Sequence, residues 1–313
     1  MAPSTRNASR SSLSPVLILA PQCPAARSPQ AVPAWGGGGC VLGCLPADPS
    51  PRSAVAQGTQ LLELDCQRTR DGVVVVSHDQ NLQRQAGQDQ NIRELDYADL
   101  PPYRDPLEVT FSPGAFSHGS DRRIPRLEEI FQKFPNVPVN VEIKQDDEEL
   151  IRQVADLVRR YRRSHITVWA SFQSKILEKC RAANPDMPYI FSVQRGLLLL
   201  LLYYTGLLPF VRLPESFLQF PLPSIINRTY FPVPKGCIGN LLAKFTHMVT
   251  MRKKLFKHLE DRGIQVLLWV LNEEKDFEEA FSYGVSGVMS DYPTLLRHYL
   301  DTHPPPGQDT TEE

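Results

Sequence analysis

The sequence lacks an excess of positive charge. Its 34 lysines and arginines stand against 35 aspartates and glutamates, which gives a formal net charge of −1. Nucleic-acid binding needs a surplus of cationic side chains, so no nucleic-acid partner is expected. With 313 residues and 42% hydrophobic content, the chain is instead long enough to build one large buried core.

The cysteines lack a regular spacing, and no secretory leader accompanies them. This argues against a disulfide framework and favours reduced thiols facing a cytosolic compartment. The pair Cys40 and Cys44 is spaced for zinc, but no second pair of ligands follows at a suitable distance, so zinc is the weaker reading. The six residues are Cys23, Cys40, Cys44, Cys66, Cys180 and Cys237.

The chain also lacks an apolar run long enough to cross a bilayer. Residues 197–211 carry no charge, but a spanning helix requires about 20 such residues. One reading makes this stretch a core helix. The other makes it a membrane-dipping segment, which we favour because an outer helix of a barrel needs a polar face and this one has none. Residues 197–223 are therefore predicted to form an apolar, membrane-contacting insertion.

Acidic residues are missing from the first 47 positions, which are rich in proline, serine, alanine and glycine. We predict that residues 1–58 form a disordered, non-homologous tail. An organelle presequence is the alternative, but no amphipathic helix supports it. Residues 303–313 are predicted to form a disordered C-terminal tail.

Between these tails, residues 59–302 alternate short apolar runs with amphipathic stretches. This order is typical of a parallel sheet with helices outside it. An α/β fold of the (β/α)8 TIM-barrel type fits best, with its chemistry at the carboxyl ends of the strands. Residues 104–125 look like an insertion beside that end. The expected strands cover about 61–66, 73–77, 138–143, 165–170, 188–193, 224–228, 265–270 and 285–290.

Two acids interrupt the first of these strands. Glu63 and Asp65 alternate with apolar residues and stand near the strand's carboxyl end. Burying them is costly unless a cation compensates, and carboxylate oxygens suit hard metals such as calcium or magnesium. His78 directly follows the next strand, so it is expected near the same end of the sheet.

A third acid, Glu142, lies at the end of a later strand. One interpretation makes it a partner of Lys144, two residues on and facing the same side. The other makes Glu142 a metal ligand and Lys144 a contact for an anionic phosphate, which we favour. His78 is open to two interpretations as well: a core histidine, or a proton donor to a leaving alkoxide beside the acids.

These motifs resemble the glycerophosphodiester phosphodiesterase domain. The resemblance runs from about Leu61 to about Leu300 and is nearest to the small membrane-associated members that act on lysophospholipids. Besides residues 61–79, it rests on Val-Glu-Ile-Lys at 141–144, Trp-Ala-Ser-Phe at 169–172, Trp-Val-Leu-Asn at 269–272 and residues 284–293.

The resemblance implies a metal-dependent phosphodiesterase of the lysophospholipase D type. Its substrates would be lysophospholipids or glycerophosphodiesters at a membrane surface, and its location the endoplasmic reticulum or perinuclear region with a cytoplasmic pool. The implied metal ligands are Glu63, Asp65 and Glu142, and His78 would act as general acid. Lys144, Phe172 and Trp269 would bind substrate, although Trp269 is also compatible with the core. Asn272 is expected either to cap a helix or to contact substrate.

One family motif is absent. The family draws its catalytic base from a His-Arg-Gly motif on the first strand, whereas this chain has no histidine before His78. The barrel is therefore expected to lack or distort its first strand and helix, as in a variant whose 5′ region has been replaced. His118 is the one plausible substitute base. The alternative function is a catalytically impaired lipid-binding or regulatory protein, and a phosphoinositide-type phospholipase C is a third, weaker reading.

Overall fold

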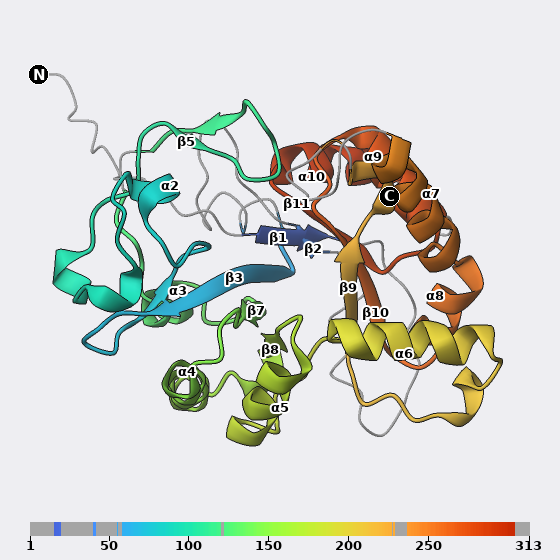
Figure 1. Ribbon diagram of the computed structural model, residues 1–313, viewed down its shortest axis with the longest axis horizontal. Coiled ribbons are helices and arrows are strands. Elements are labelled where there is room, and N and C mark those ends of the chain that lie inside the picture. Colours follow the sequence, from blue (N-terminus) through green and yellow to red (C-terminus); the bar gives the residue numbers. More distant parts are fainter. Residues whose placement is uncertain are drawn as a thin grey trace, which may run out of the picture.

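The computed structural model describes residues 16–19, 40–41, 55, 58–119, 122–226, 228 and 237–303. Most of the two predicted tails, 1–58 and 303–313, lies outside the described residues, so their disorder stays a prediction there. Figure 1 shows the described part as a ring of strands with helices packed around it.

A ring of mostly parallel strands forms the centre of the fold. Hydrogen bonding joins them in the order β8-β7-β3-β1-β11-β10-β9, and Tyr189 and Ile190 bridge β8 to β9. The seven strands and this bridging pair fill the eight positions of the ring, which confirms the predicted TIM-type barrel. The parallel strands are β3 (Leu61–Arg68), β7 (Val139–Glu142), β8 (Thr167–Ala170), β9 (Phe217–Pro221), β10 (Gln265–Trp269) and β11 (Gly287–Ser290).

A strand occupies the first position of the ring, but it is antiparallel to its neighbours, whereas the first strand of a TIM barrel is parallel to them. Strand β1 (Val16–Leu19) pairs antiparallel with both β3 and β11, and β2 (Cys40–Val41) pairs with β1. Within the predicted tail, residues 16–19 and 40–41 form short strands, and the first strand of the barrel is distorted because it is antiparallel to both neighbours. An apolar run of Val, Leu and Ile favours a strand, and the open edges of β3 and β11 supply hydrogen-bonding partners in either direction.

The predicted second barrel strand at 73–77 is instead half of a hairpin. Strand β4 (Val74–Val76) runs antiparallel to β3, with Cys66 opposite Val76. Only five residues separate the two strands, and a parallel connection needs a crossover of about a dozen or more. Gly72 supplies the left-handed conformation of the turn, with φ 86°.

The strand predicted at 224–228 is wrong. The sixth barrel position belongs to β9, which lies inside the segment 197–223 that was predicted to be a membrane-contacting insertion. A 3-10 turn, η5 (Pro223–Ile225), follows it. Proline at 221 and 223 ends the strand because proline donates no ladder hydrogen bond. The predicted insertion therefore cannot extend past residue 216, and of the strand expected at 188–193 only Tyr189 and Ile190 form bridges.

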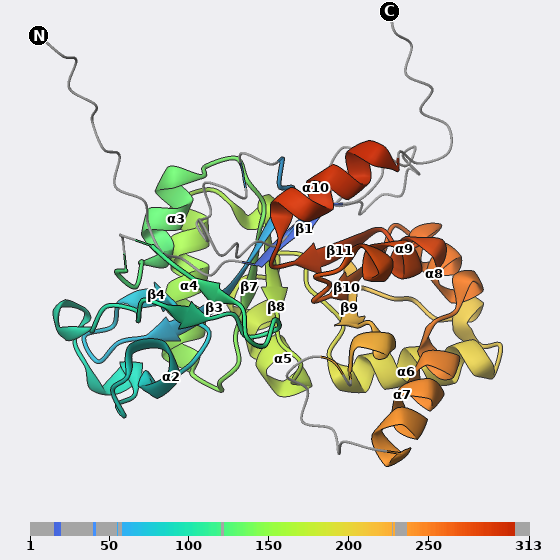
Figure 2. The ribbon, with the colours of Figure 1, turned by 90° about the horizontal axis from the view of Figure 1, so that it is seen from above.

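Helices surround the ring, with α3, α4 and α5 on one side and α6 to α9 on the other in Figure 2. Helix α4 is amphipathic, and its face of Leu150, Ile151, Val154 and Val158 is buried. The barrel helices are α3 (Leu127–Lys133), α4 (Glu148–Arg160), α5 (Ser174–Ala183), α6 (Val193–Tyr204), α7 (Cys237–Thr250), α8 (Lys253–Glu260), α9 (Glu274–Ser282) and α10 (Pro293–Thr302).

The connection from β4 to α3 carries the predicted insertion. Its strands β5 (Leu107–Glu108) and β6 (Phe116–Ser117) form a small separate sheet. The remaining short elements are α2 (Gln83–Ala86), η1 (Ile92–Glu94), η2 (Tyr97–Asp99), η3 (Ser164–Ile166) and η4 (Leu208–Phe210). Within the described ranges, every helix is too short or too polar to traverse a bilayer.

A buried arginine fastens the turn between α3 and β7. Arg163 donates to the carbonyl of Phe134 at 2.9 Å and also to the carbonyls of Pro135 and Val137. Its guanidinium carbon lies 4.7 Å from the centroid of the Phe131 ring. Burial lowers the pKa of Arg163 to about 10, which leaves it charged at neutral pH.

We expect Arg163→Met to lower the free energy of unfolding by about 3 kcal/mol, because it leaves buried carbonyls without a donor. Urea unfolding followed by circular dichroism measures the change. Arg160→Met, at an exposed position of α4, is the matched control and should cost less than about 1 kcal/mol. Equal losses for the two variants would contradict the role given to Arg163.

Candidate active site

The register of β3 with β7 brings the three predicted metal ligands together. Asp65 lies opposite Glu142, and Glu63 lies opposite Asn140. Because side chains alternate along a strand, all three acids point to the same face, toward the inside of the barrel. One carboxylate oxygen from each lies within 4.8 Å of the others. Their predicted convergence is confirmed, while their role as ligands stays a prediction.

The cluster is unfavourable without a cation. Burial, followed by the charges of Asp65 and Glu142, raises the pKa of Glu63 well above its usual value. Burial and Asp65 likewise raise the pKa of Glu142 to about 8. The Oε1 atom of Glu63 is buried and has no hydrogen-bond partner. An orphaned carboxylate oxygen beside two further acids fits the oxygen-rich coordination that calcium and magnesium take.

Lys144 is the cation that the chain itself supplies. Its Nζ lies 2.7 Å from Oδ1 of Asp65, so its ion-pair partner is Asp65 rather than the Glu142 of the alternative interpretation. Burial alone would lower the pKa of Lys144, but the charges of Asp65 and Glu142 outweigh burial and raise it. One ammonium group offsets one of three carboxylates, which leaves the cluster a net anion when all are ionised.

His78 reaches the same end because the β3–β4 hairpin folds back. The amide of Ser77 donates to the carbonyl of Asp65 at 3.0 Å, and His78 follows directly, with 37% of its side chain exposed. Its Nδ1 lies 2.6 Å from Asp79, whose other oxygen accepts from Arg84 at 2.6 Å. Burial would raise the pKa of Asp79, but the hydrogen bonds from His78 and Arg84 lower it to about 2.

With Nδ1 held by an ionised carboxylate, the ring is oriented and Nε2 is the nitrogen available to a substrate. This is the chain of contacts that a proton donor needs, and it argues against a core histidine. The contact from Asp79 was not predicted, although an aspartate directly after His78 was visible in the sequence.

A second network was missed at the ends of β10 and β11. Nδ2 of Asn272 donates to Asp291 and to Oγ of Ser112, both at 2.8 Å, and Oδ1 accepts from the amide of Asp291 at 2.8 Å. Asn272 is therefore not the predicted helix cap; Glu273 occupies that position of α9. Burial raises the pKa of Asp291 to about 6, against the opposing effects of Asn272 and His78. An acid directly after an apolar strand was the clue to Asp291.

Aromatic rings line one side of the site. The Trp269 ring centroid lies 5.8 Å from that of Phe172 and 6.2 Å from that of Phe111. Trp269 is half-buried, so part of its side chain packs in the core and part remains accessible. Phe111, which the sequence did not single out, comes from the insertion. A cavity of about 390 Å³ adjoins this wall and is lined in part by Phe111, Asn272 and Tyr292.

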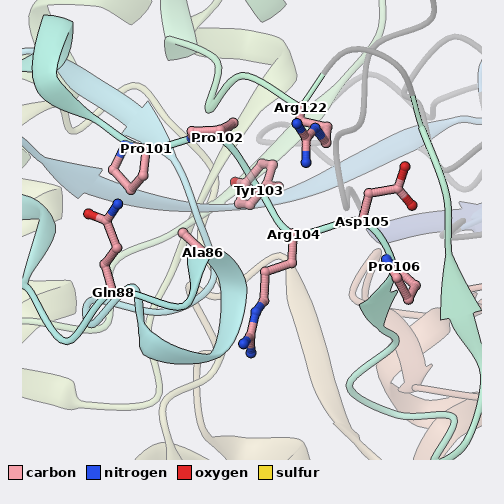
Figure 3. A pocket seen from close by; sticks show the side chains of 9 residues that line it. All are labelled: Ala86, Gln88, Pro101, Pro102, Tyr103, Arg104, Asp105, Pro106 and Arg122. Carbon is pink, nitrogen blue, oxygen red and sulfur yellow. The ribbon is translucent and has the colours of Figure 1, made fainter.

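The predicted substitute base lies elsewhere. Nδ1 of His118 is 2.9 Å from Asp105, which lines a pocket of about 570 Å³ with Tyr103, Arg104 and Arg122 (Figure 3). None of the three clustered acids lines this pocket. The structure thus gives His118 a surface ion-pair partner and no contact with the acid cluster.

Comparisons with known proteins identify the family of the chain. The model of the glycerophosphoryl diester phosphodiesterase family matches residues 48–295. The chain is 58% identical to human Lysophospholipase D GDPD3, over 81% of this chain and 80% of that protein. It is 49% identical to human Lysophospholipase D GDPD1, over 79% of each chain.

A solved structure from Silicibacter pomeroyi DSS-3, which carries the same family name, superposes with a TM-score of 0.60. It is 22% identical, and the match covers 80% of this chain and 86% of that one. At this identity the likeness concerns the fold, and it agrees with the barrel. On the extent of the family match and the identity to the two human proteins, the chain belongs to the glycerophosphoryl diester phosphodiesterase family.

Proposed function

We propose that the protein is a metal-dependent phosphodiester hydrolase of the lysophospholipase D type. It would cleave lysophospholipids or glycerophosphodiesters to lysophosphatidic acid or glycerol phosphate and an alcohol. The observation that carries the proposal is the convergence of Glu63, Asp65 and Glu142 beside His78. The two human relatives, both named Lysophospholipase D, support the substrate class.

Glu63, Asp65 and Glu142 would hold the divalent cation, calcium or magnesium. When bound, such a cation supplies positive charge to the nonbridging oxygens of the phosphodiester. Lys144 adds a second positive group next to Asp65, suited to the same phosphate. The rings of Phe172 and Trp269 offer an apolar wall to the glycerol and acyl part of the substrate.

His78 would donate the proton that the leaving alkoxide needs. In the balanced reaction, water adds its hydroxyl to phosphorus, the phosphorus–oxygen bond to the alcohol breaks, and the alcohol leaves with a proton. Asp79 keeps Nδ1 engaged and stabilises the charged imidazole, so the proton leaves from Nε2. Arg84 holds Asp79 in place through its own hydrogen bond.

A catalytically impaired lipid-binding or regulatory protein is the second candidate. The observation in its favour is the missing histidine of the first strand: β1 reads Val-Leu-Ile-Leu, and the sequence has no histidine before His78. His118, the substitute considered above, pairs with Asp105 instead. These features predict slow turnover relative to a family member that bears the His-Arg-Gly strand.

Choline release from lysophosphatidylcholine distinguishes the two candidates. If His78 is the general acid, His78→Ala should lower the rate by about 10²–10⁴-fold, whereas His118→Ala should change it less than about twofold. A wild-type rate no higher than that of His78→Ala would favour the impaired form. A large loss in His118→Ala would contradict the position assigned to that residue.

The metal site is tested by thermal unfolding. Calcium or magnesium at about 100 times its Kd should stabilise the wild-type chain by about 2.7 kcal/mol, because only the folded state binds it. The combined variant Glu63→Gln, Asp65→Asn and Glu142→Gln should show no rise in Tm with metal. The control removes three acids from α4, by Glu148→Gln, Glu149→Gln and Asp156→Asn, and should keep the rise. A metal-dependent rise in the first variant would reject the site.

The metal-free protein should lose stability as pH rises from about 4.5 to about 8. The pKa of Glu142 is about 8 in the folded state against 4.5 as its reference value, so within this window the folded state binds more protons than the unfolded state. The contribution is complete below the lower value and is lost above the higher one. Urea unfolding with a chelator measures the slope, which Glu142→Gln should reduce. An unchanged slope would show that Glu142 titrates normally.

We further propose that the protein associates with membranes, at the endoplasmic reticulum or perinuclear region with a cytoplasmic pool. The membrane association is supported by helix α6, which covers only part of the uncharged segment 197–211. Leu199 is 1% exposed and belongs to the core, while Leu197 and Leu201 on the same helix face solvent. The helix therefore combines both interpretations: one face packs on the barrel and the other is apolar and exposed.

A further inference from the structure

Large apolar side chains gather on one part of the surface. Among the described residues, thirteen large hydrophobic side chains are exposed, and eleven of them lie on α6, α7 and the turn after α6. The other two, Phe116 and Phe172, lie in the insertion and in the aromatic wall. Scattered exposed hydrophobics need no explanation, but a contiguous group marks an interaction surface.

The first half of this surface is α6. Its exposed residues Val193, Leu197, Leu201 and Tyr204 recur at intervals of three or four and so form one stripe. The stripe starts at the site, because the amide of Val193 donates to the carbonyl of Phe172 at 3.0 Å. It continues after the helix to Phe210, which is 85% exposed.

The second half is α7, which the sequence analysis did not single out. Leu241, Phe245 and Met248 form a stripe of the same period, with Leu241 69% and Phe245 57% exposed, while Ala243 is buried. The two helices meet at their carboxyl ends, where Tyr204 donates to the carbonyl of Val249 at 2.8 Å. Both ribbon views place α6 and α7 on the same side of the barrel (Figures 1 and 2).

The stretch of chain that carries these stripes is rich in basic residues. Residues 187–259 contain nine lysines and arginines and a single acid, Glu215, so they carry a formal charge of +8. The side chain of Glu215 is 2% exposed and pairs with Arg195 at 2.6 Å. Lys244 on α7 and Lys253 and Lys254 at the start of α8 are exposed. Among its described residues this stretch has no exposed carboxylate of its own, although Glu279 lies 3.1 Å from His247 of α7 and Asp261 pairs with Lys257 of α8.

We propose that the exposed faces of α6 and α7 together form a docking surface for an anionic lipid bilayer. Apolar stripes on helices that lie in the interface bury their side chains at the acyl boundary, and basic neighbours add attraction to acidic head groups. A second copy of the chain would bring the same positive charges face to face, which opposes self-association here. The inference rests on the proposed function, in which the substrate is a membrane lipid, and it names α7 and head-group charge as new determinants.

The test is co-sedimentation of the full chain with vesicles. Wild-type protein should bind vesicles of phosphatidylcholine with phosphatidylserine at least about tenfold more tightly than phosphatidylcholine alone, and the difference should shrink at high salt. The variant Leu241→Asp with Phe245→Asp should bind the mixed vesicles at least about tenfold more weakly. The neutral variant Leu241→Ser with Phe245→Ser should also lose binding, which separates apolar contact from charge.

Two further variants make the outcome specific. Asn136→Asp with Ala182→Asp adds the same two charges at exposed positions on the other side of the barrel and should keep full binding. Leu197→Asp with Leu201→Asp tests α6 separately. Normal binding by the α7 variants together with a loss in the α6 variant would overturn the two-helix surface and leave membrane association through α6 intact.

Other results would also overturn the inference. Equal binding to neutral and acidic vesicles would remove the charge component. A wild-type dimer that becomes monomeric in the Leu241→Asp, Phe245→Asp variant, measured by light scattering, would make this face a contact between copies. Hydrolysis of water-soluble glycerophosphocholine is the separate readout of the proposed function. The α7 variants should match wild type there, and a wholly inactive wild-type chain would refute the activity without affecting the vesicle result.

Discussion

The parallel pairing of β3 with β7 is the interaction on which the site depends. It sets Asp65 beside Glu142 and, through the two-residue period, turns Glu63 to the same side. A shift of one residue would turn these acids to the opposite face of the sheet, toward the helices and away from one shared site. The hairpin then uses the free edge of β3 to return the chain, which is how His78 arrives without a barrel strand of its own.

Much of the fold could be predicted from short apolar runs between amphipathic stretches, which located β3, β7, β8, β10 and β11. This pattern does not predict the direction of a strand, because a buried strand has the same apolar sequence in a hairpin and in a parallel sheet. For this reason β4 was predicted as a barrel strand, although it forms a hairpin with β3. Strand β9 was missed because Phe217–Pro221 continues the apolar character of α6, and composition alone does not separate a strand inside the barrel from a lipid-facing segment.

The acids of the site could be predicted because a carboxylate in an apolar strand is costly, and that cost is visible in one short stretch of sequence. The network around Asn272 could not be predicted in this way. Its partners Asp291 and Ser112 lie 19 and 160 residues away, so only the folded chain shows that they meet. Phe111 was missed for the same reason, since its place beside Trp269 depends on how the insertion folds over the barrel.

The small net charge conceals a separation of charge. Residues 187–259 carry nine basic residues against one acid, and the rest of the chain carries 25 against 34, so +8 and −9 sum to −1. The exposed Lys244, Lys253 and Lys254 place part of this positive charge on the surface of α7 and α8, although the net charge of the chain is nearly zero. In the field above an acidic surface such a particle experiences a torque before any contact forms, within about a Debye length. Orientation would thus precede adhesion, and the protein would arrive with α6 and α7 already turned toward the surface.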